Sequence, residues 1–166
     1  NKIDDIADKK NFNVLPHRKI FHDFFFLKKG SSIRTKGLNS FTINAPAIFF
    51  LPAYQITEHK MMSEDAEGYY CHFGENIFDF FSKLILSERY VFFQYQSNPI
   101  IKLQPNNIEI IEKILERLLY LHTSKEYNKT LLSFHLMTLF EEINAVCTVN
   151  KTFEKRKANF EITKRY

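Results

Sequence analysis

Short apolar runs, each followed by a turn, occupy the chain between residues 20 and 73. The runs fall near 20–28, 31–36, 41–44, 47–51, 55–61 and 67–73. They are rich in aromatic and β-branched residues, and turn formers such as Lys29-Gly30 and Ala45-Pro46 lie between them. Short strands at such close spacing predict a small antiparallel β-barrel, and a barrel of this size can hold one small ligand.

The C-terminal half predicts two longer helices, because apolar residues there recur at intervals of three and four. In the first helix, Asn106 and Glu109 occupy the positions of a capping box. The second helix is expected to begin near Thr123, with Glu126 as its capping partner, and to run to about Val146. The predicted fold class is therefore mainly β with α, a small antiparallel barrel followed by an antiparallel pair of helices.

The region between the barrel and the helix pair predicts a further, short helix. Its apolar residues, at helical spacing, are Ile77, Phe80, Phe81, Leu84 and Ile85. We expect this helix to close one end of the barrel, before residues 90–104 return to a β-like composition. The predicted organisation is an N-terminal arm at 1–16, the barrel with its short helix at 17–105, the helix pair at 106–147 and a basic linker at 148–166.

The second long helix has apolar residues on two sides. One seam consists of Leu132, Leu136, Leu139, Ile143 and Val146, and the other of Leu131, Phe134, Met137 and Phe140. Two interpretations are open. Either one seam packs on the first helix and the other on the barrel, or the first seam forms the contact of a twofold homodimer.

Composition and charge favour a soluble protein without a nucleic-acid-binding barrel. The 18 Phe and 8 Tyr among 166 residues supply ample aromatic side chains for a core. No apolar run approaches the roughly 20 residues that span a bilayer, and the first ten residues lack a signal-peptide pattern, so we expect a cytoplasmic protein. The net charge of +4 lies in the last sixteen residues, with six basic and two acidic side chains, and this tail is expected to be a solvated linker.

The residue types that carry catalysis do not form an active-site pattern in this chain. Six histidines occur, but no two of them are two residues apart, the spacing by which a barrel strand usually holds a metal ion. Ordinary hydrogen-bonded histidines are the favoured interpretation over a metal site. Neither a Gly-x-Ser-x-Gly turn nor a phosphate-binding glycine loop is present. We therefore expect a binding protein, without metal or cofactor, rather than an enzyme.

The strands do supply the residues of a typical small-molecule site, aromatic rings with a few polar groups. Phe24 and Phe26 share one face of their strand, and Tyr70 and His72 share one face of theirs. If these faces point inward, the rings would bracket a ligand, and His59, His72 and the Tyr70 hydroxyl would orient it. The alternative interpretation is that the same rings simply fill the barrel.

Several segments follow one another in an order that characterises a known family. They are Phe24-Phe25-Phe26-Leu27-Lys28-Lys29-Gly30, Phe41–Pro52, His59, Glu67-Gly68-Tyr69-Tyr70-Cys71-His72-Phe73 and the helix pair at 106–146. In this order the chain, from Pro16 to Tyr166, resembles the N-terminal, cupin-like effector-binding and dimerisation domain of AraC-type transcription regulators, in a form similar to those of Bacteroidetes bacteria. The resemblance implies a jelly-roll barrel, a small-molecule effector such as a sugar or related metabolite, and a homodimer.

The resemblance also implies a coupling between ligand and DNA. A ligand in the barrel would change how attached DNA-binding domains are presented. We also hypothesise that residues 1–16 act as a lid, because they are polar, lack periodicity and precede the first strand. Residues 160–166 resemble the start of the first DNA-binding helix, so we expect the natural sequence to continue, with the basic tail leading toward DNA. Two other classes stay open: a stand-alone metal-dependent cupin enzyme, such as an isomerase or oxygenase, and a barrel that binds carbohydrate or a partner protein without a regulatory role.

Overall fold

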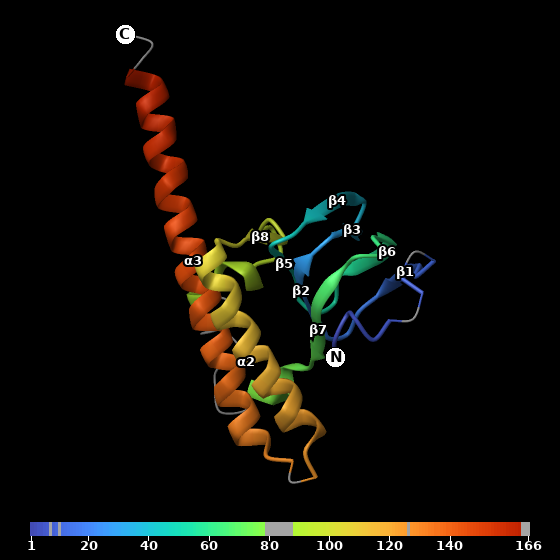
Figure 1. The fold of residues 1–166 in the computed structure, drawn as a ribbon. Helices are drawn as coiled ribbons and strands as arrows, with labels where there is room; N and C mark the ends of the chain where they lie inside the picture. Colours follow the sequence, from blue (N-terminus) through green and yellow to red (C-terminus); the bar gives the residue numbers. More distant parts are fainter. Residues whose placement is uncertain (7, 10, 79–87, 126, 164–166) are drawn as a thin grey trace.

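The computed structural model describes the backbone of residues 1–163, except residues 7, 10, 79–87 and 126. It describes the side chains of residues 1–148, except residues 7, 10, 78–87 and 126. Two β-sheets make up one part of the molecule, and the two long helices lie along one side of it (Figure 1). Within the described residues, neither long helix is apolar enough over a sufficient length to cross a membrane.

Each sheet has four strands, and all neighbouring strands are antiparallel. The first sheet contains, in spatial order, β1 (Val14–Arg18), β6 (Ile56–Met62), β3 (Ser31–Lys36) and β4 (Asn39–Asn44). The second contains β7 (Glu67–Phe73), β2 (His22–Lys29), β5 (Ala47–Leu51) and β8 (Ile100–Lys102). The sheets do not close into a barrel, so the prediction of a closed barrel is wrong. Strand spacing and turn residues indicate where strands lie along the chain, but not whether the outermost strands pair.

The six strands predicted between residues 20 and 73 are confirmed, with ends that agree within two residues. Strand β1 was not predicted, because its sequence lies in the polar arm and lacks an apolar run. Within the β-like stretch at 90–104, only β8 is a strand, and Val91–Phe93 forms a 3-10 turn, η2. Glu75–Phe78 forms another 3-10 turn, η1, and the rest of the predicted short helix lies outside the described residues.

The two long helices are confirmed, but their ends differ from the prediction. Helix α2 (Pro105–Thr123) is capped by Gln104 and Asn107, not by Asn106 and Glu109, because Pro105 already occupies the first helical position. Thr123 is not an N-cap either. It ends α2, where its hydroxyl donates to the Leu119 carbonyl oxygen at 2.9 Å.

Helix α3 spans Lys129–Thr163 and begins after Asn128, whose side chain accepts a hydrogen bond from the Leu131 backbone N–H at 2.8 Å. Glu126 lies outside the described residues. The helix continues past residue 147, so most of the segment predicted as a basic linker is helical. Its Lys, Arg, Glu and Ala residues are good helix formers, which accounts for the continuation.

Strand β2 is buried on both faces and separates two core regions. Phe24 and Phe26 point toward the helices, where they pack with residues of α2 and α3. Phe25 and Leu27 point toward the other sheet and pack in the second core region. The structure therefore has three layers, with the second sheet between the first sheet and the helices.

The helix seam predicted as a dimer contact lies inside this core. Leu136, Leu139, Ile143 and Val146 are at most 5% exposed and belong to the cluster that joins the helices to the second sheet. Leu132 is partly buried and packs against the same cluster. This placement favours the interpretation in which the seam packs within one chain, and a dimer contact through it would require the fold to open.

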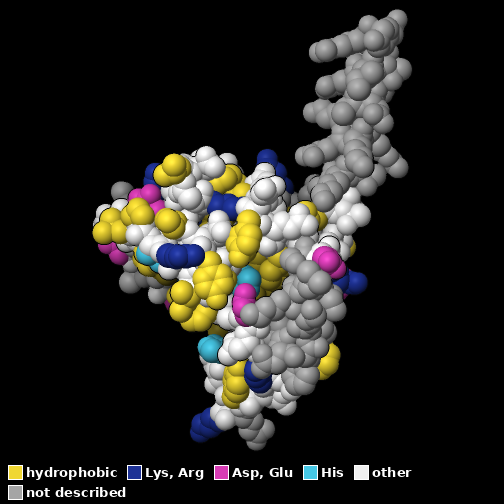
Figure 2. Space-filling model, turned by 180° about the vertical axis from the view of Figure 1, so that it is seen from behind, with side chains coloured by type: hydrophobic (Ala, Val, Ile, Leu, Met, Phe, Trp, Pro, Cys, Tyr) yellow, Lys and Arg dark blue, Asp and Glu magenta, His cyan; other side chains and the backbone are white. Residues whose placement is uncertain are grey.

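Exposed apolar side chains gather over the β-sheet part on the face shown in Figure 2. Large apolar residues of that part with exposed side chains are Leu15, Ile20, Phe21, Leu38, Tyr54, Ile56 and Met61. Apolar atoms supply more than half of the surface of a typical folded protein, so this exposure alone does not identify a binding surface.

Candidate ligand-binding site

A cavity of about 170 Å³ lies where the first sheet, the second sheet and the N-terminal segment meet. Its polar walls come from His17, Lys19, Asp23, Arg34, Thr57, His59, Tyr70 and His72, and its apolar walls come from Ile6, Phe12, Val14 and Phe25. Small-molecule sites typically combine apolar walls with a few polar groups in this way. We therefore take this cavity as the candidate functional site.

Asp23 is the central charged group of the cavity, and its side chain is 1% exposed. Lys19 Nζ donates to Oδ2 at 2.6 Å, Arg34 Nη1 approaches the same oxygen at 3.4 Å, and His72 Nε2 lies 3.0 Å from Oδ1. Burial alone would raise the pKa of this carboxyl, but the hydrogen bond with His72 and the charges of Arg34 and Lys19 hold the pKa well below its usual range. Asp23 is thus an ionised carboxylate that contacts Lys19, Arg34 and His72.

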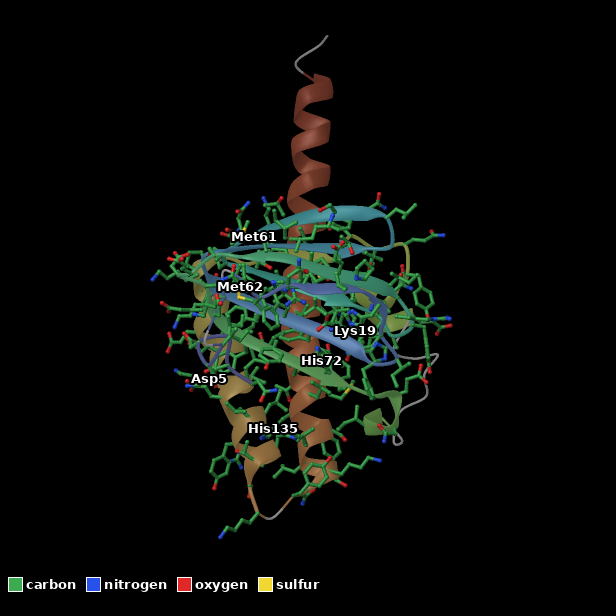
Figure 3. The ribbon with its side chains drawn as sticks, turned by 90° about the vertical axis from the view of Figure 1, so that its right-hand side faces the viewer. Asp5, Lys19, Met61, Met62, His72 and His135 are labelled. Atoms are coloured by element: carbon green, nitrogen blue, oxygen red, sulfur yellow. The ribbon has the colours of Figure 1, made fainter. Side chains whose placement is uncertain are left out.

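Lys19 and His72 lie next to each other, as Figure 3 shows. Lys19 Nζ and His72 Nε2 are 3.0 Å apart. His72 has an exposed side chain, whereas Lys19 is largely buried. The pair thus forms the more open side of the charged cluster.

Arg34 forms the inner side of the cluster and is 8% exposed. Its guanidinium carbon lies 3.9 Å from the centre of the Phe25 ring, a cation–π contact. Its Nε has no hydrogen-bond partner among the residues that the structure describes. Because a buried donor without a partner is unfavourable, Arg34 has unused capacity to bind an acceptor in the cavity.

His59 is 4% exposed and lies opposite Arg34 on the neighbouring strand. Neither of its ring nitrogens has a hydrogen-bond partner within the described part of the chain. The Phe12 ring packs edge-on against the imidazole, with 4.9 Å between ring centres. Burial, with the charge of Arg34 added, lowers the pKa of His59 from 6.5 to about 3, so the ring is neutral near pH 7.

His59 is expected to make stability depend on pH between 7 and 5. Below pH 6.5 the unfolded chain takes up a proton at this position, whereas the folded chain does so only near pH 3. Stability is therefore lost as the pH falls, by about 2 kcal/mol between pH 7 and pH 5. Urea unfolding at both pH values, compared with His59→Phe, isolates this contribution. An equal loss of stability in the variant would contradict it.

The N-terminal segment forms one wall of the cavity. Its first residues pair with the edge of β7, through Ile3 N–H to the Gly68 carbonyl and Tyr70 N–H to the Asn1 carbonyl, both at 2.9 Å. Ile3 is completely buried against the sheets. Ile6 and Phe12 then reach the cavity itself. The segment predicted as an arm thus lies against both sheets.

The structure brings together three of the five residues predicted to bind a ligand. His59, Tyr70 and His72 line the cavity. Phe24 and Phe26 lie on the opposite face of β2, in the core beneath the helices. His22 shares that face, and its Nδ1 accepts a hydrogen bond from the Ala53 backbone N–H at 3.1 Å.

The prediction missed the charged residues of the site, Lys19, Asp23 and Arg34. Asp23 carries a signal in the sequence, because an acidic residue inside a run of Phe is rarely buried without a partner. Arg34 and Lys19 carry no such signal, since both occur in polar surroundings.

Across the described residues, no group of three or more His, Cys, Asp or Glu side chains is placed to hold a metal ion. No protein-family model matches the chain, and no match was found among curated proteins. A functional assignment therefore depends on the cavity and on the chemistry of Asp23, Arg34 and His59.

Proposed function

We propose that the chain is the ligand-sensing domain of a bacterial AraC-type transcription regulator, which binds a small molecule in the cavity between its sheets. One observation carries the proposal. Arg34 and His59 are buried polar side chains that line the same cavity, and both have nitrogens without a hydrogen-bond partner among the described residues. Unpartnered buried polar atoms destabilise a fold. A ligand that supplies their partners would remove this cost, which is typical of a binding site.

The size of the cavity limits the ligand to a small molecule. At about 170 Å³ it is slightly larger than the engineered cavity of about 150 Å³ that admits benzene. A ligand of roughly six to twelve non-hydrogen atoms would fill such a cavity and its mouth. This range includes small sugars and metabolic acids.

Strand β7 offers a route from the cavity to the helices. Tyr70 and His72 line the cavity, whereas Tyr69 and Phe73 pack toward the helices from the other face of the same strand. The Tyr69 hydroxyl also approaches Glu116 Oε1 of α2 at 3.4 Å. A ligand that shifts β7 would therefore act on the helix pair, and through α3 on an attached DNA-binding domain.

A thermal-shift screen of sugars and small metabolic acids tests the proposal. A compound that binds the folded chain at one hundred times its Kd should stabilise it by about 2.7 kcal/mol and raise Tm. The same compound should have little effect on His59→Phe, which keeps an aromatic packing group but no ring nitrogen. Stabilisation that is equal in the variant would place the ligand elsewhere, and the proposal would fail for this cavity.

Phe12 is expected to act as part of a cover over the ligand. Replacing Phe12 with Ala removes the ring that packs on His59, so the affinity for the compound found in the screen should fall about tenfold. Isothermal titration measures this change. Phe21→Ala, which truncates an exposed Phe outside the cavity lining, is the matched control and should leave the affinity unchanged. Unchanged affinity in Phe12→Ala would remove the role of the N-terminal segment as a lid.

A further inference from the structure

The charges that line the cavity do not balance. Lys19 and Arg34 are cationic, and Asp23 is the single carboxylate among the described lining residues. His72, on the open side, also contacts Asp23 and adds no negative charge. Because Arg34 is at least nine-tenths buried, an excess of positive charge there is unfavourable unless an anion joins it.

Arg34 has a donor left for such an anion. Its contact with Asp23 is long, at 3.4 Å, and Asp23 is already engaged by Lys19 and His72 at 2.6 and 3.0 Å. The Nε donor has no partner in the described part of the chain. A guanidinium N–H without a partner suits a carboxylate oxygen, because hydrogen bonds between charged groups are strong.

His59 favours a hydroxyl group of the ligand, whereas Arg34 favours a carboxylate. A neutral imidazole has one N–H donor and one acceptor nitrogen, and both are unpartnered among the described residues. A carboxylate can satisfy only the donor. A hydroxyl group can donate to the bare ring nitrogen or accept from the N–H, so it can bind whichever nitrogen faces the cavity, whereas a carboxylate can bind only the N–H.

The two groups lie close together. Arg34 and His59 are direct partners on the neighbouring strands β3 and β6, and both line the cavity. Side chains at such positions start from Cβ atoms about 5 Å apart. One small molecule can therefore reach both, provided that its acidic group and its hydroxyl are on adjacent or nearly adjacent carbons.

We infer that the cavity binds a small hydroxycarboxylate, with the carboxylate at Arg34 and a hydroxyl at His59. This inference rests on the proposed function, because it specifies the ligand of the same cavity. The rings of Phe12 and Phe25 cover the carbon skeleton from the apolar side.

Three probes of similar size separate the two contacts. Lactate carries both groups, propionate lacks the hydroxyl, and 1,2-propanediol lacks the carboxylate. Isothermal titration of the whole chain at low salt should give a Kd for lactate at least tenfold lower than the Kd of either other probe. A tenfold difference is the size expected when one buried hydrogen-bonding group loses its partner.

Substitutions assign each difference to a residue. In His59→Phe, lactate and propionate should bind with equal affinity. In Arg34→Met, lactate should lose its advantage over 1,2-propanediol. Arg117→Met, on the exposed surface of α2, is the matched control and should keep all three affinities. If Arg34→Met does not fold, the comparison in His59→Phe still tests the hydroxyl contact, and the wild-type comparison of lactate with 1,2-propanediol tests the carboxylate contact.

Several results would overturn the inference. If 1,2-propanediol binds as tightly as lactate, no anion is selected, and if propionate does so, no hydroxyl is selected. Failure of lactate to bind at 10 mM, where a Kd of about 1 mM would give nearly full occupancy, contradicts the inference as well. After any of these results, the proposed function still holds if a neutral compound from the thermal-shift screen binds the chain and its binding depends on His59. If no such compound is found, the proposed function fails together with the inference.

Discussion

Replacing Leu139 with glutamate is expected to unfold the domain rather than to separate two subunits. Leu139 is completely buried between the helices and the second sheet. Loss of a buried Leu side chain costs about 2 to 5 kcal/mol, and an unpaired buried carboxylate adds to this. The total approaches the 5 to 15 kcal/mol that stabilises a typical domain. Circular dichroism and urea unfolding would measure the loss.

The control for this experiment lies on the same helix. Phe134 is 56% exposed, so Phe134→Glu should change stability by no more than about 0.5 kcal/mol. A folded, monomeric Leu139→Glu protein would contradict the burial of this residue within one chain. It would return the seam of Leu132, Leu136, Leu139, Ile143 and Val146 to the dimer interface that the sequence suggested.

Asp23→Ala is expected to be the most damaging change in the charged cluster. It leaves Arg34 buried without an anionic partner and removes the acceptor of Lys19. Breaking a buried ion pair from one side typically costs about 3 to 5 kcal/mol. Urea unfolding at pH 7 and constant ionic strength would measure the change.

Two further variants show whether the loss of stability in Asp23→Ala comes from the buried charges. Glu67→Ala breaks an ion pair with Lys29 in which both side chains are exposed, so it should cost no more than about 1 kcal/mol. The double variant Asp23→Leu with Arg34→Met removes both buried charges and should be more stable than Asp23→Ala. If Asp23→Ala loses as little as Glu67→Ala, the buried cluster does not stabilise the fold.

The strands and helices could be predicted from the sequence, but the closure of the sheets could not. Turn residues such as Lys29-Gly30 separate the strands clearly, so the bounds of the strands follow from the sequence. Their neighbours in the sheets do not follow, because β2 and β3 lie in different sheets and β2 pairs with the distant strands β5 and β7. The pairing of outer strands depends on twist and on bulges, such as the one between Leu27 and Lys29, and apolar spacing does not report either. Strand β1 escaped prediction for a related reason, since an edge strand with exposed side chains needs no apolar pattern.

The candidate site was only partly predictable because β2 is buried on both faces. A strand that is buried on both sides carries apolar residues on both faces, so Phe24 and Phe25 look alike in the sequence. The assignment of Phe24 to the ligand side was therefore arbitrary, and the structure places Phe25 there instead. Strand β6 did show its inner positions, because the buried residues Thr57 and His59 alternate with more exposed ones.

The pairing of Asn1–Ile3 with β7 has a consequence for the solubility of the chain. Strand β7 is the edge of one sheet, and β1, which follows the same N-terminal segment, covers β6 in the other. Without residues 1–18, the N–H and C=O groups of two strands would be left unpaired at sheet edges, and such edges attach to strands of other chains. The N-terminal segment therefore also protects the domain against aggregation.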